Sequence, residues 1–296
     1  MTPDLLRTIL DCYPNALRVM LIGIGEPLLS PHLSELVGEC VKRRMIVDTV
    51  SNGVALDAHT PEILRWGLDR LCVSVNGHTA EDFHRLTGMP EASFSKILRN
   101  VQNLVRARSD NKAMIRIEIS FIVDTGNYRH LGEMMELAEN LGVDGANFYN
   151  FLPTPYPGFT PEERCLYEDD PGVQEELGRL MSKIFRCDVT WPRLLKRHGE
   201  RRTICTDPFT LLQVDGDGNV GGCSIAMLNM HENGKIWDKN PWNNEYFRDL
   251  RRRHLNGDLL WPCKYCGKSA GVEPSHAAKS ILSQNQPWGG YGDCCT

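Results

Sequence analysis

This 296-residue chain contains eleven cysteines, the residue type in it best suited to bind a metal or to react. Four of them gather toward the C-terminus, namely Cys205, Cys223, Cys263 and Cys266, and the last two form a C-x2-C pair. Thiolates are soft ligands for iron and zinc, and a C-x2-C turn lets two sulfurs reach one metal. We therefore expect these four residues to hold one centre, either a structural zinc ion or an iron–sulfur cluster.

The remaining cysteines lack the spacing of metal ligands. We expect packed, unreactive thiols at five positions, which are Cys12, Cys40, Cys72, Cys165 and Cys187. Cys294 and Cys295, in the last three residues, are expected to form an oxidisable tail, with a role as further ligands left open.

A second candidate site is the stretch VMLIGIGEPLLSP, residues 19–31. A short apolar run ends in a loop with two glycines, Glu26 and Pro27, and Ser30-Pro31 then opens an amphipathic helix. Glycine lets backbone come close to a ligand, and the oxygens of Glu26 suit an ammonium group. Taken alone, the pattern also fits an ordinary strand-to-helix turn.

Alternating strands and helices must position this loop. Apolar runs predict strands at 19–22, 46–50, 71–75, 115–123 and 146–151. Helical spacing predicts helices at 2–12, 31–44, 94–108 and 128–141, and a short helix that begins at Thr60-Pro61 and ends at Gly67. Such alternation favours an α/β fold whose parallel sheet curls toward a barrel, with ligands at the carboxyl ends of its strands.

The residue composition and the predicted elements change after residue 151. Five prolines between 152 and 171 predict a linker, followed by a helix near 173–186 and a short strand at 188–191. From residue 203 short strands and glycine turns dominate, with a hairpin at 211–225 that turns at Asp217-Gly218. We expect four segments: a barrel at 1–151, a linker and helix at 152–202, a cysteine-rich domain at 203–267 and a tail at 268–296.

Composition restricts the class of protein. Hydrophobic residues make up 41% and charged residues 24% of the chain, as in a soluble globular protein, and the net charge is −5. The negative charge argues against a general nucleic-acid surface, and no apolar run is long enough to span a bilayer. The sequence thus predicts a cytoplasmic protein without a membrane or nucleic-acid partner.

Several segments resemble one family in the same order along the chain. GIGEPLLSP resembles the "GGEP" segment of radical S-adenosylmethionine (SAM) enzymes. The four C-terminal cysteines, with the G-x4-C element from Gly218 to Cys223, resemble the twitch domain, a shortened SPASM domain that holds an auxiliary [4Fe–4S] cluster. The resemblance implies a partial (β/α)6 TIM-like barrel with a small β-hairpin and helix domain after it.

The resemblance also implies a set of SAM-binding residues. Gly25, Glu26 and Pro27 would hold the methionine amino group, and Ser51 and Asn52 match a "TNG" segment that lines the site. Further positions at strand ends would meet the ribose, the carboxylate or the adenine, and these are Ser74, Asn76, Ser120 and Asn150. Asn76 stands where many relatives carry aspartate, and each of these polar residues could instead form a simple turn.

One departure from the family pattern matters. The CxxxCxxC motif that holds the radical-generating cluster is absent from residues 1–296, and one strand is missing at the front of the barrel. We expect the chain to be a fragment of a longer protein, which would be inactive as given, rather than a degenerate relative.

The family's chemistry implies hydrogen-atom abstraction from a small molecule or a peptide, with the auxiliary cluster accepting an electron and flavodoxin or ferredoxin as reductant. Arg116 and Glu118 share a strand face with Ser120 and would either bind substrate or pair with each other. Two alternatives remain: a non-catalytic barrel that binds a nucleotide-like ligand or a protein partner, and a zinc-stabilised structural protein.

Overall fold

The computed structural model describes residues 1–151, 161–195, 205–223, 227–259 and 263. Contacts divide the chain into two compact units. Ala16–Leu195 form the sheet unit, and Met1–Asn15 together with Lys196–Thr296 form the terminal unit.

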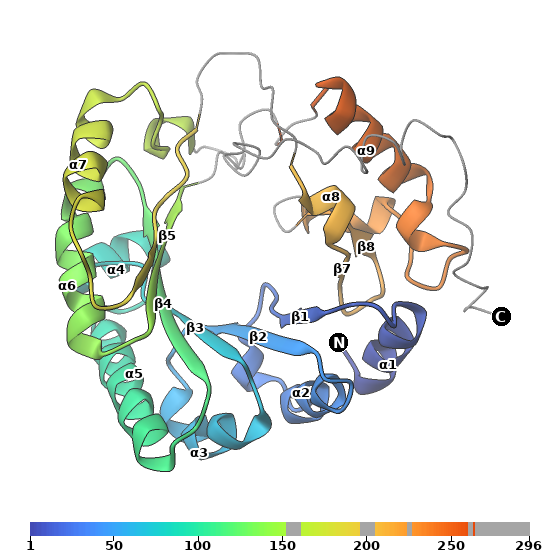
Figure 1. Cartoon of the computed structure of the whole chain (residues 1–296), viewed down its shortest axis with the longest axis horizontal. Helices are drawn as coiled ribbons and strands as arrows, with labels where there is room; N and C mark the ends of the chain where they lie inside the picture. Colours follow the sequence, from blue (N-terminus) through green and yellow to red (C-terminus); the bar gives the residue numbers. More distant parts are fainter. Residues whose placement is uncertain (152–160, 196–204, 224–226, 260–262, 264–296) are drawn as a thin grey trace. The chain divides into compact units, whose positions relative to one another are not determined.

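The sheet unit is built on six parallel strands that follow one another in chain order (Figure 1). They are β1 (Arg18–Leu21), β2 (Ile46–Ser51), β3 (Arg70–Ser74), β4 (Arg116–Val123), β5 (Gly145–Asn150) and β6 (Asp188–Thr190). Because every pair is parallel, all carboxyl ends lie at one edge of the sheet. Each of the six strands overlaps a strand that the sequence predicts.

Helices connect the strands and cover one face of the sheet (Figure 1). The sheet is curved, and the helices lie on its convex face. The α-helices are α2 (Leu33–Lys42), α3 (Leu56–Trp66), α4 (Ala80–Thr87), α5 (Glu91–Asn111), α6 (Leu131–Leu141) and α7 (Pro171–Met181). Short 3-10 turns are η1 (Pro27–Leu29), η2 (Tyr128–His130) and η3 (Pro161–Arg164). This arrangement is that of a partial TIM-like barrel. Among the described helices, none is both long and apolar enough to cross a membrane.

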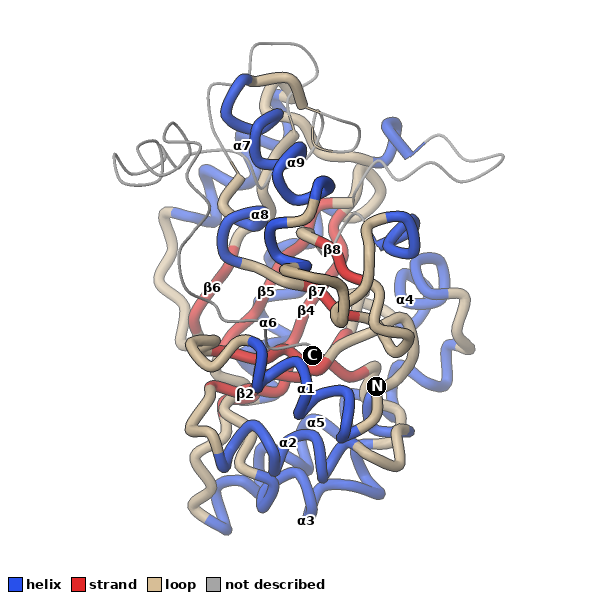
Figure 2. The backbone as a smooth tube through the Cα atoms, turned by 90° about the vertical axis from the view of Figure 1, so that its right-hand side faces the viewer, coloured by secondary structure: helices blue, strands red, loops and turns tan. Residues whose placement is uncertain are grey.

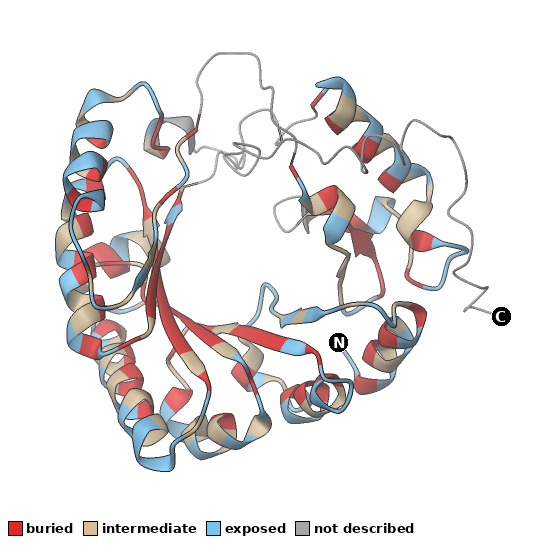
Figure 3. Cartoon of the chain, in the orientation of Figure 1, coloured by how far each residue is buried: buried red, intermediate tan, exposed pale blue. Residues whose placement is uncertain are grey.

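Strand residues alternate between the two faces, as the pleat of a β-strand requires. On the helix-covered face Leu71, Ile117 and Ile119 are fully buried, which makes the strands the centre of the core (Figure 3). Stacked rings extend this core toward β6, with Phe148 5.3 Å from Phe121 and 5.5 Å from Trp191 between ring centroids. The opposite, concave face carries the charged and polar strand residues.

The terminal unit combines both ends of the described chain. It contains α1 (Pro3–Cys12), α8 (Asp207–Thr210), β7 (Gln213–Val214), β8 (Val220–Gly221), η4 (Met227–Glu232), η5 (Pro241–Asn243) and α9 (Glu245–Asn256). The strands β7 and β8 pair antiparallel and lie beside α8 (Figure 2). The predicted hairpin is therefore confirmed.

Fully buried Val220, Ile236 and Phe247 form the core of the terminal unit, and Leu5 and Ile9 of α1 pack against them. The hairpin turn depends on glycine. Gly218 has a φ of +76°, and a Cβ there would lie 2.2 Å from a ring carbon of Trp237. Asp215 completes the turn, because its Oδ1 accepts the backbone N–H groups of Asp217 and Asn219, each at 2.9 Å.

The units differ from the segments expected from sequence in two respects. Helix α1 packs with the hairpin rather than with the sheet unit. The short strand predicted at 188–191, in the segment expected as a linker and helix, is β6, and it joins the sheet by pairing with β5 from Asp188↔Gly145 to Thr190↔Asn147. Both differences are tertiary pairings, which local sequence patterns do not reveal.

Candidate functional site

The loop after β1 is fixed by one carboxylate. Oε1 of Glu26 accepts the backbone N–H of Leu28 at 3.1 Å, which caps η1, and Oε2 accepts the backbone N–H of Asn52 at 2.7 Å. Pro27 follows as the first residue of η1. Glu26 thus ties the loop after β1 to the loop after β2, two predicted binding segments at the carboxyl edge of the sheet.

Gly25 lies in this loop without a structural need for glycine. Its φ is not in the left-handed region, and a Cβ built on Gly25 would meet nothing within 4 Å. The neighbouring Ile24 is 92% exposed. Neither backbone strain nor packing within the described residues explains the glycine, so this backbone is open to close approach by a ligand.

The Ser51-Asn52 segment forms a tight turn. Ser51 Oγ accepts the N–H of Gly53 at 3.0 Å, and Asn52 Oδ1 accepts the N–H of Val54 at 3.0 Å. Ser51 is buried, whereas Asn52 is half-buried. The turn alternative therefore accounts for both side chains, and the contribution of this segment to the site is the backbone N–H of Asn52 that orients Glu26.

Ser74 and Ser120 are brought together on the concave face. They are direct partners in the β3–β4 register, and the carbonyl of Ser120 accepts the N–H groups of Val75 at 2.9 Å and Asn76 at 3.1 Å. Asn76 has a φ of +55°, a conformation that asparagine tolerates better than most residues. The three predicted residues therefore lie next to one another at the carboxyl end of β3.

Asn150 has an interior role. Its Nδ2 donates to the carbonyls of Leu166 at 2.8 Å and Arg193 at 2.9 Å, and its Oδ1 accepts the N–H of Leu166 at 2.9 Å. The side chain is buried and anchors two later segments to the end of β5. A contact of Asn150 with adenine remains a prediction.

A row of alternating charges crosses the concave face toward the amino ends of the strands. In order, the row is Arg18, Asp48, Arg70, Glu118, Arg116 and Asp188, with successive N···O distances of 3.2, 3.5, 2.9, 2.5 and 2.6 Å. The expected pairing of Arg116 with Glu118 is confirmed. Each of these charged side chains forms an ion pair with its neighbour in the row, so ion pairs occupy this end of the concave face.

Two carboxylates of this row differ in their electrostatics. Burial raises the pKa of Asp48, which is fully buried and lacks a hydrogen bond, although Arg70 and Arg18 oppose the shift. Burial also pushes the pKa of Glu118 upward, but hydrogen bonds from Arg116 and Asn147 outweigh it, and the pKa lies below its usual value. Glu118 is therefore ionised at neutral pH and holds the row together.

Sequence reasoning missed a second ionic cluster at the carboxyl edge. Asp124, directly after β4, is 1% exposed and pairs with Arg85 at 2.9 Å and with Arg164. Arg85 also bridges to Asp82 at 2.6 Å. The signal was an acidic residue directly after the clearest predicted strand. The cluster fastens α4 and η3 to the carboxyl end of β4.

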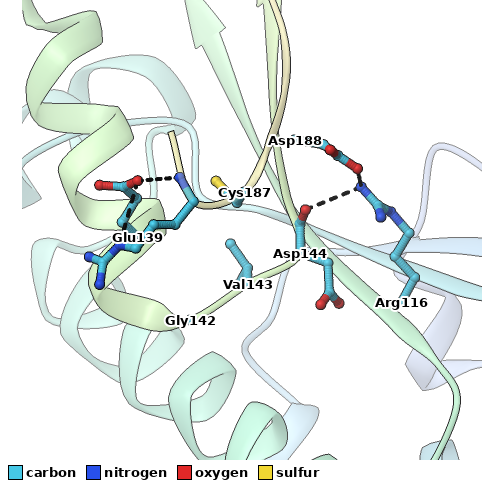
Figure 4. A pocket seen from close by; sticks show the side chains of 8 residues that line it. Arg116, Glu139, Gly142, Val143, Asp144, Cys187 and Asp188 are labelled. Atoms are coloured by element: carbon cyan, nitrogen blue, oxygen red, sulfur yellow. Dashed lines mark hydrogen bonds and ion pairs between the residues drawn. The ribbon is translucent and has the colours of Figure 1, made fainter. Parts of the chain in front are cut away.

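A shallow cavity of about 430 Å³ lies at the amino ends of β5 and β6 (Figure 4). Arg116, Asp144, Cys187 and Asp188 help to line it, and Arg116 bonds to both the Asp144 carbonyl and the Asp188 carboxylate. Burial raises the pKa of the Cys187 thiol. The cavity lies at the edge of the sheet opposite to the predicted SAM residues and is not part of that site.

Three of the four predicted metal ligands are described in the terminal unit. Cys205 is buried, Cys223 and Cys263 are half-buried, and Cys266 lies outside the described residues. Within the described part, no three His, Cys, Asp or Glu side chains gather closely enough to hold a metal. Burial raises the pKa of the Tyr246 phenol, and the charges of Cys223 and Cys263 add to the rise.

Cysteines elsewhere behave as packed thiols. Burial raises the pKa of Cys40 and of Cys72 to about 11, and Cys12 and Cys165 are also buried. Thiols of this kind are weak nucleophiles and poor ligands at neutral pH.

Comparisons with known proteins find one family model and several relatives. Residues 1–138 match the family model described as the Radical SAM superfamily. The cofactor-modifying protein of a tungsten-containing aldehyde ferredoxin oxidoreductase from Pyrococcus furiosus is 29% identical over 169 residues, which cover 54% of this chain and 44% of that protein. A PqqA peptide cyclase from Granulibacter bethesdensis is 26% identical over 127 residues, 43% of this chain and 32% of the cyclase. Each match spans less than half of the relative.

Solved structures show the same fold. SuiB from Streptococcus suis, bound to its precursor peptide SuiA, aligns with a TM-score of 0.64 at 12% identity and covers 85% of this chain and 60% of SuiB. SuiB bound to S-adenosylmethionine aligns with a TM-score of 0.58. The family model thus supports a relation of residues 1–138 to the radical SAM superfamily, and the solved neighbours show a similar fold.

Proposed function

We propose that this chain is the SAM-binding part of a radical SAM enzyme that modifies a peptide and also carries one auxiliary [4Fe–4S] cluster. The single observation that carries the proposal is the Gly25–Glu26 loop. It combines an open backbone with a carboxylate held between two strand-end loops, and it lies in the region that matches the superfamily. When bound beside a reduced cluster, SAM supplies the family's hydrogen-abstracting chemistry.

Glu26 has the capacity for the role proposed here. Its two carboxylate oxygens offer about four lone-pair sites, of which Leu28 and Asn52 use two. The others suit the ammonium group of methionine, and open space over Gly25 admits the ligand. Ser74, Asn76 and Ser120 would meet its polar oxygens from β3 and β4.

A peptide substrate is favoured by the relatives. SuiB is described with a bound precursor peptide, and the Granulibacter protein is a peptide cyclase. On this chain, half-exposed Tyr149 stands opposite Ile122 in the β4–β5 register on the concave face, above the row of ion pairs. That surface is accessible, whereas the charges below it are already paired.

A radical-generating cluster would be held by a CxxxCxxC motif, and no such motif occurs among residues 1–296. Strand β1 is the outer strand of the sheet, so a further strand could pair with it. Apolar side chains along and beside β1 are exposed: Leu17 is 80% and Met20 42% exposed. Genomic sequence before Met1 tests whether an in-frame CxxxCxxC motif and a further strand precede this residue.

Hydrogen exchange tests the proposed site. We expect added SAM to slow amide exchange in residues 22–30 and 51–54, because the ligand would order the two loops that Glu26 joins. Helix α7, remote in the sequence from both loops, serves as the internal reference. Protection that is absent, or confined to segments away from the carboxyl edge, would contradict the proposal.

A further inference from the structure

Strand β5 exposes an aromatic ring on the concave face of the sheet unit. Tyr149 is 51% exposed, whereas Phe148 and Asn150 on either side of it are buried, because successive strand residues point to opposite faces. In the β4–β5 register Tyr149 lies opposite Ile122, which is half-buried. The ring and the isoleucine therefore offer apolar area that a ligand can cover.

The described strand residues next to this ring on the same face are uncharged. Ser120 and Asn147 are direct register partners one step toward the amino ends of β4 and β5, and both are buried. Thr190 of β6 is exposed and pairs with Asn147 in the register. Nδ2 of Asn147 donates to Glu118 at 2.9 Å, so this amide is engaged with the row of ion pairs below. A ligand over Tyr149 thus meets strand side chains without a formal charge.

The row of ion pairs below the ring offers little to a charged ligand. Three arginines and three carboxylates alternate along it, so their formal charges sum to zero. Glu118, in the middle of the row, accepts hydrogen bonds from Arg70 at 2.9 Å and from Arg116 at 2.5 Å. With the bond from Asn147, three of about four lone-pair sites on this carboxylate are used. Asp48, which lacks a hydrogen bond, is fully buried and out of reach of a ligand.

The two most exposed members of the row lie farther from the ring. Asp188, with its side chain 80% exposed, is the register partner of Gly145, four residues before Tyr149. At about 3.3 Å per residue, this separation is roughly 13 Å along the strand. Arg18, with its side chain 55% exposed, belongs to β1 at the opposite side of the sheet. A charged side chain placed on Tyr149 would therefore lose water without gaining an ion pair to either residue, which is unfavourable.

We propose that Tyr149 is a specificity-determining residue that selects an apolar side chain of the peptide substrate, aromatic ones most strongly, against charged ones. The inference rests on the peptide substrate of the proposed function and adds the chemistry of the residue that contacts β5. An aromatic side chain would gain a stacked or edge-to-face contact with the Tyr149 ring in addition to covering apolar area. A charged side chain would meet uncharged strand residues beside the ring and ion pairs below it.

Binding of small amides measures this preference without the natural peptide. The N-acetyl amides of tryptophan, lysine and glutamate are titrated with the full chain, and dissociation constants are taken from the nuclear magnetic resonance line widths of each amide. We expect the tryptophan amide to bind most tightly. Tyr149→Phe should keep this affinity, and Tyr149→Ser should lose roughly two- to tenfold of it. Trp237→Ser removes a ring that is also 51% exposed but lies in the terminal unit, and should bind like the wild type. Equal binding of the three amides, or no effect of Tyr149→Ser, would overturn the inference.

A charge added beside the ring tests the same reasoning in the opposite direction. Thr190→Asp places a carboxylate on the concave face at the register partner of Asn147 and leaves Tyr149 intact, so it is informative even if Tyr149→Ser does not fold. We expect this variant to bind the lysine amide roughly two- to fivefold more tightly than the wild type does. High salt should remove the gain, because it screens an exposed ion pair. An unchanged affinity for the lysine amide would overturn the inference.

Binding of SAM to the wild-type chain separates this inference from the proposed function. A chain that binds SAM and also prefers the tryptophan amide supports both. A chain that binds SAM but shows no preference among the amides refutes only the role of Tyr149. A chain that does not bind SAM refutes the proposed function, whatever the amides show.

Discussion

Replacing Gly53 with alanine should destabilise the sheet unit through both backbone strain and overpacking. Gly53 has a φ of +80°, and a Cβ there would lie 2.7 Å from Val73 Cγ1 and 2.8 Å from Ile97 Cγ2. The left-handed backbone alone costs a side chain about 1–2 kcal/mol. Overpacking against two buried β-branched residues adds about 1–3 kcal/mol.

Gly88 provides the matched control. Its φ is +70°, but a Cβ there would meet nothing within 4 Å, so Gly88→Ala carries the backbone cost without the packing cost. The difference between the two variants should therefore be the packing term, about 1–3 kcal/mol. The measurement is urea unfolding of the sheet unit, monitored by hydrogen exchange of peptides from β2 and β3. Equal destabilisation by the two variants would refute the reasoning.

Two further predictions concern titration. Burial alone would raise the pKa of Asp124, but Arg85 and Arg164 outweigh burial, so the pKa in the folded chain lies below the ordinary 3.8. The ionised Asp124 therefore stabilises the fold above about pH 4, and this stabilisation is lost as the pH falls. Asp124→Asn should thus flatten the loss of stability in acid, as followed by circular dichroism; an unchanged acid slope would contradict the pairing. Cys40 and Cys72, whose pKa values are about 11, should resist iodoacetamide at pH 8 until the chain is unfolded, and mass spectrometry that finds either alkylated as fast as in urea would contradict their burial.

The strand order and the hairpin could be predicted from sequence because both depend on local signals. Strand β4 shows strict alternation and lies where that pattern places it, and Asp217-Gly218 forms the turn between β7 and β8. Helix α3 was predicted to begin at Thr60-Pro61 but begins at Leu56 with Pro61 inside it. The hydroxyl of Thr60 bonds to the carbonyl of Leu56 within the helix rather than capping it.

Features that depend on tertiary contacts could not be predicted. Asn150 reads as a strand-end ligand, but its partners, Leu166 and Arg193, are 16 and 43 residues away. Helix α4 was missed although Thr79 caps it and Gly88 ends it, because an eight-residue helix has too little apolar periodicity to stand out.

Equilibrium dialysis of SAM tests the central claim most directly. Gly25→Val fills the space over the loop with a side chain, whereas Gly178→Val places the same side chain on another exposed glycine whose Cβ would also meet nothing. We predict that Gly25→Val weakens SAM binding by about tenfold or more, or about 1.4 kcal/mol, and that Gly178→Val binds like the wild type. Equal affinity of all three chains would contradict a cofactor site at this loop.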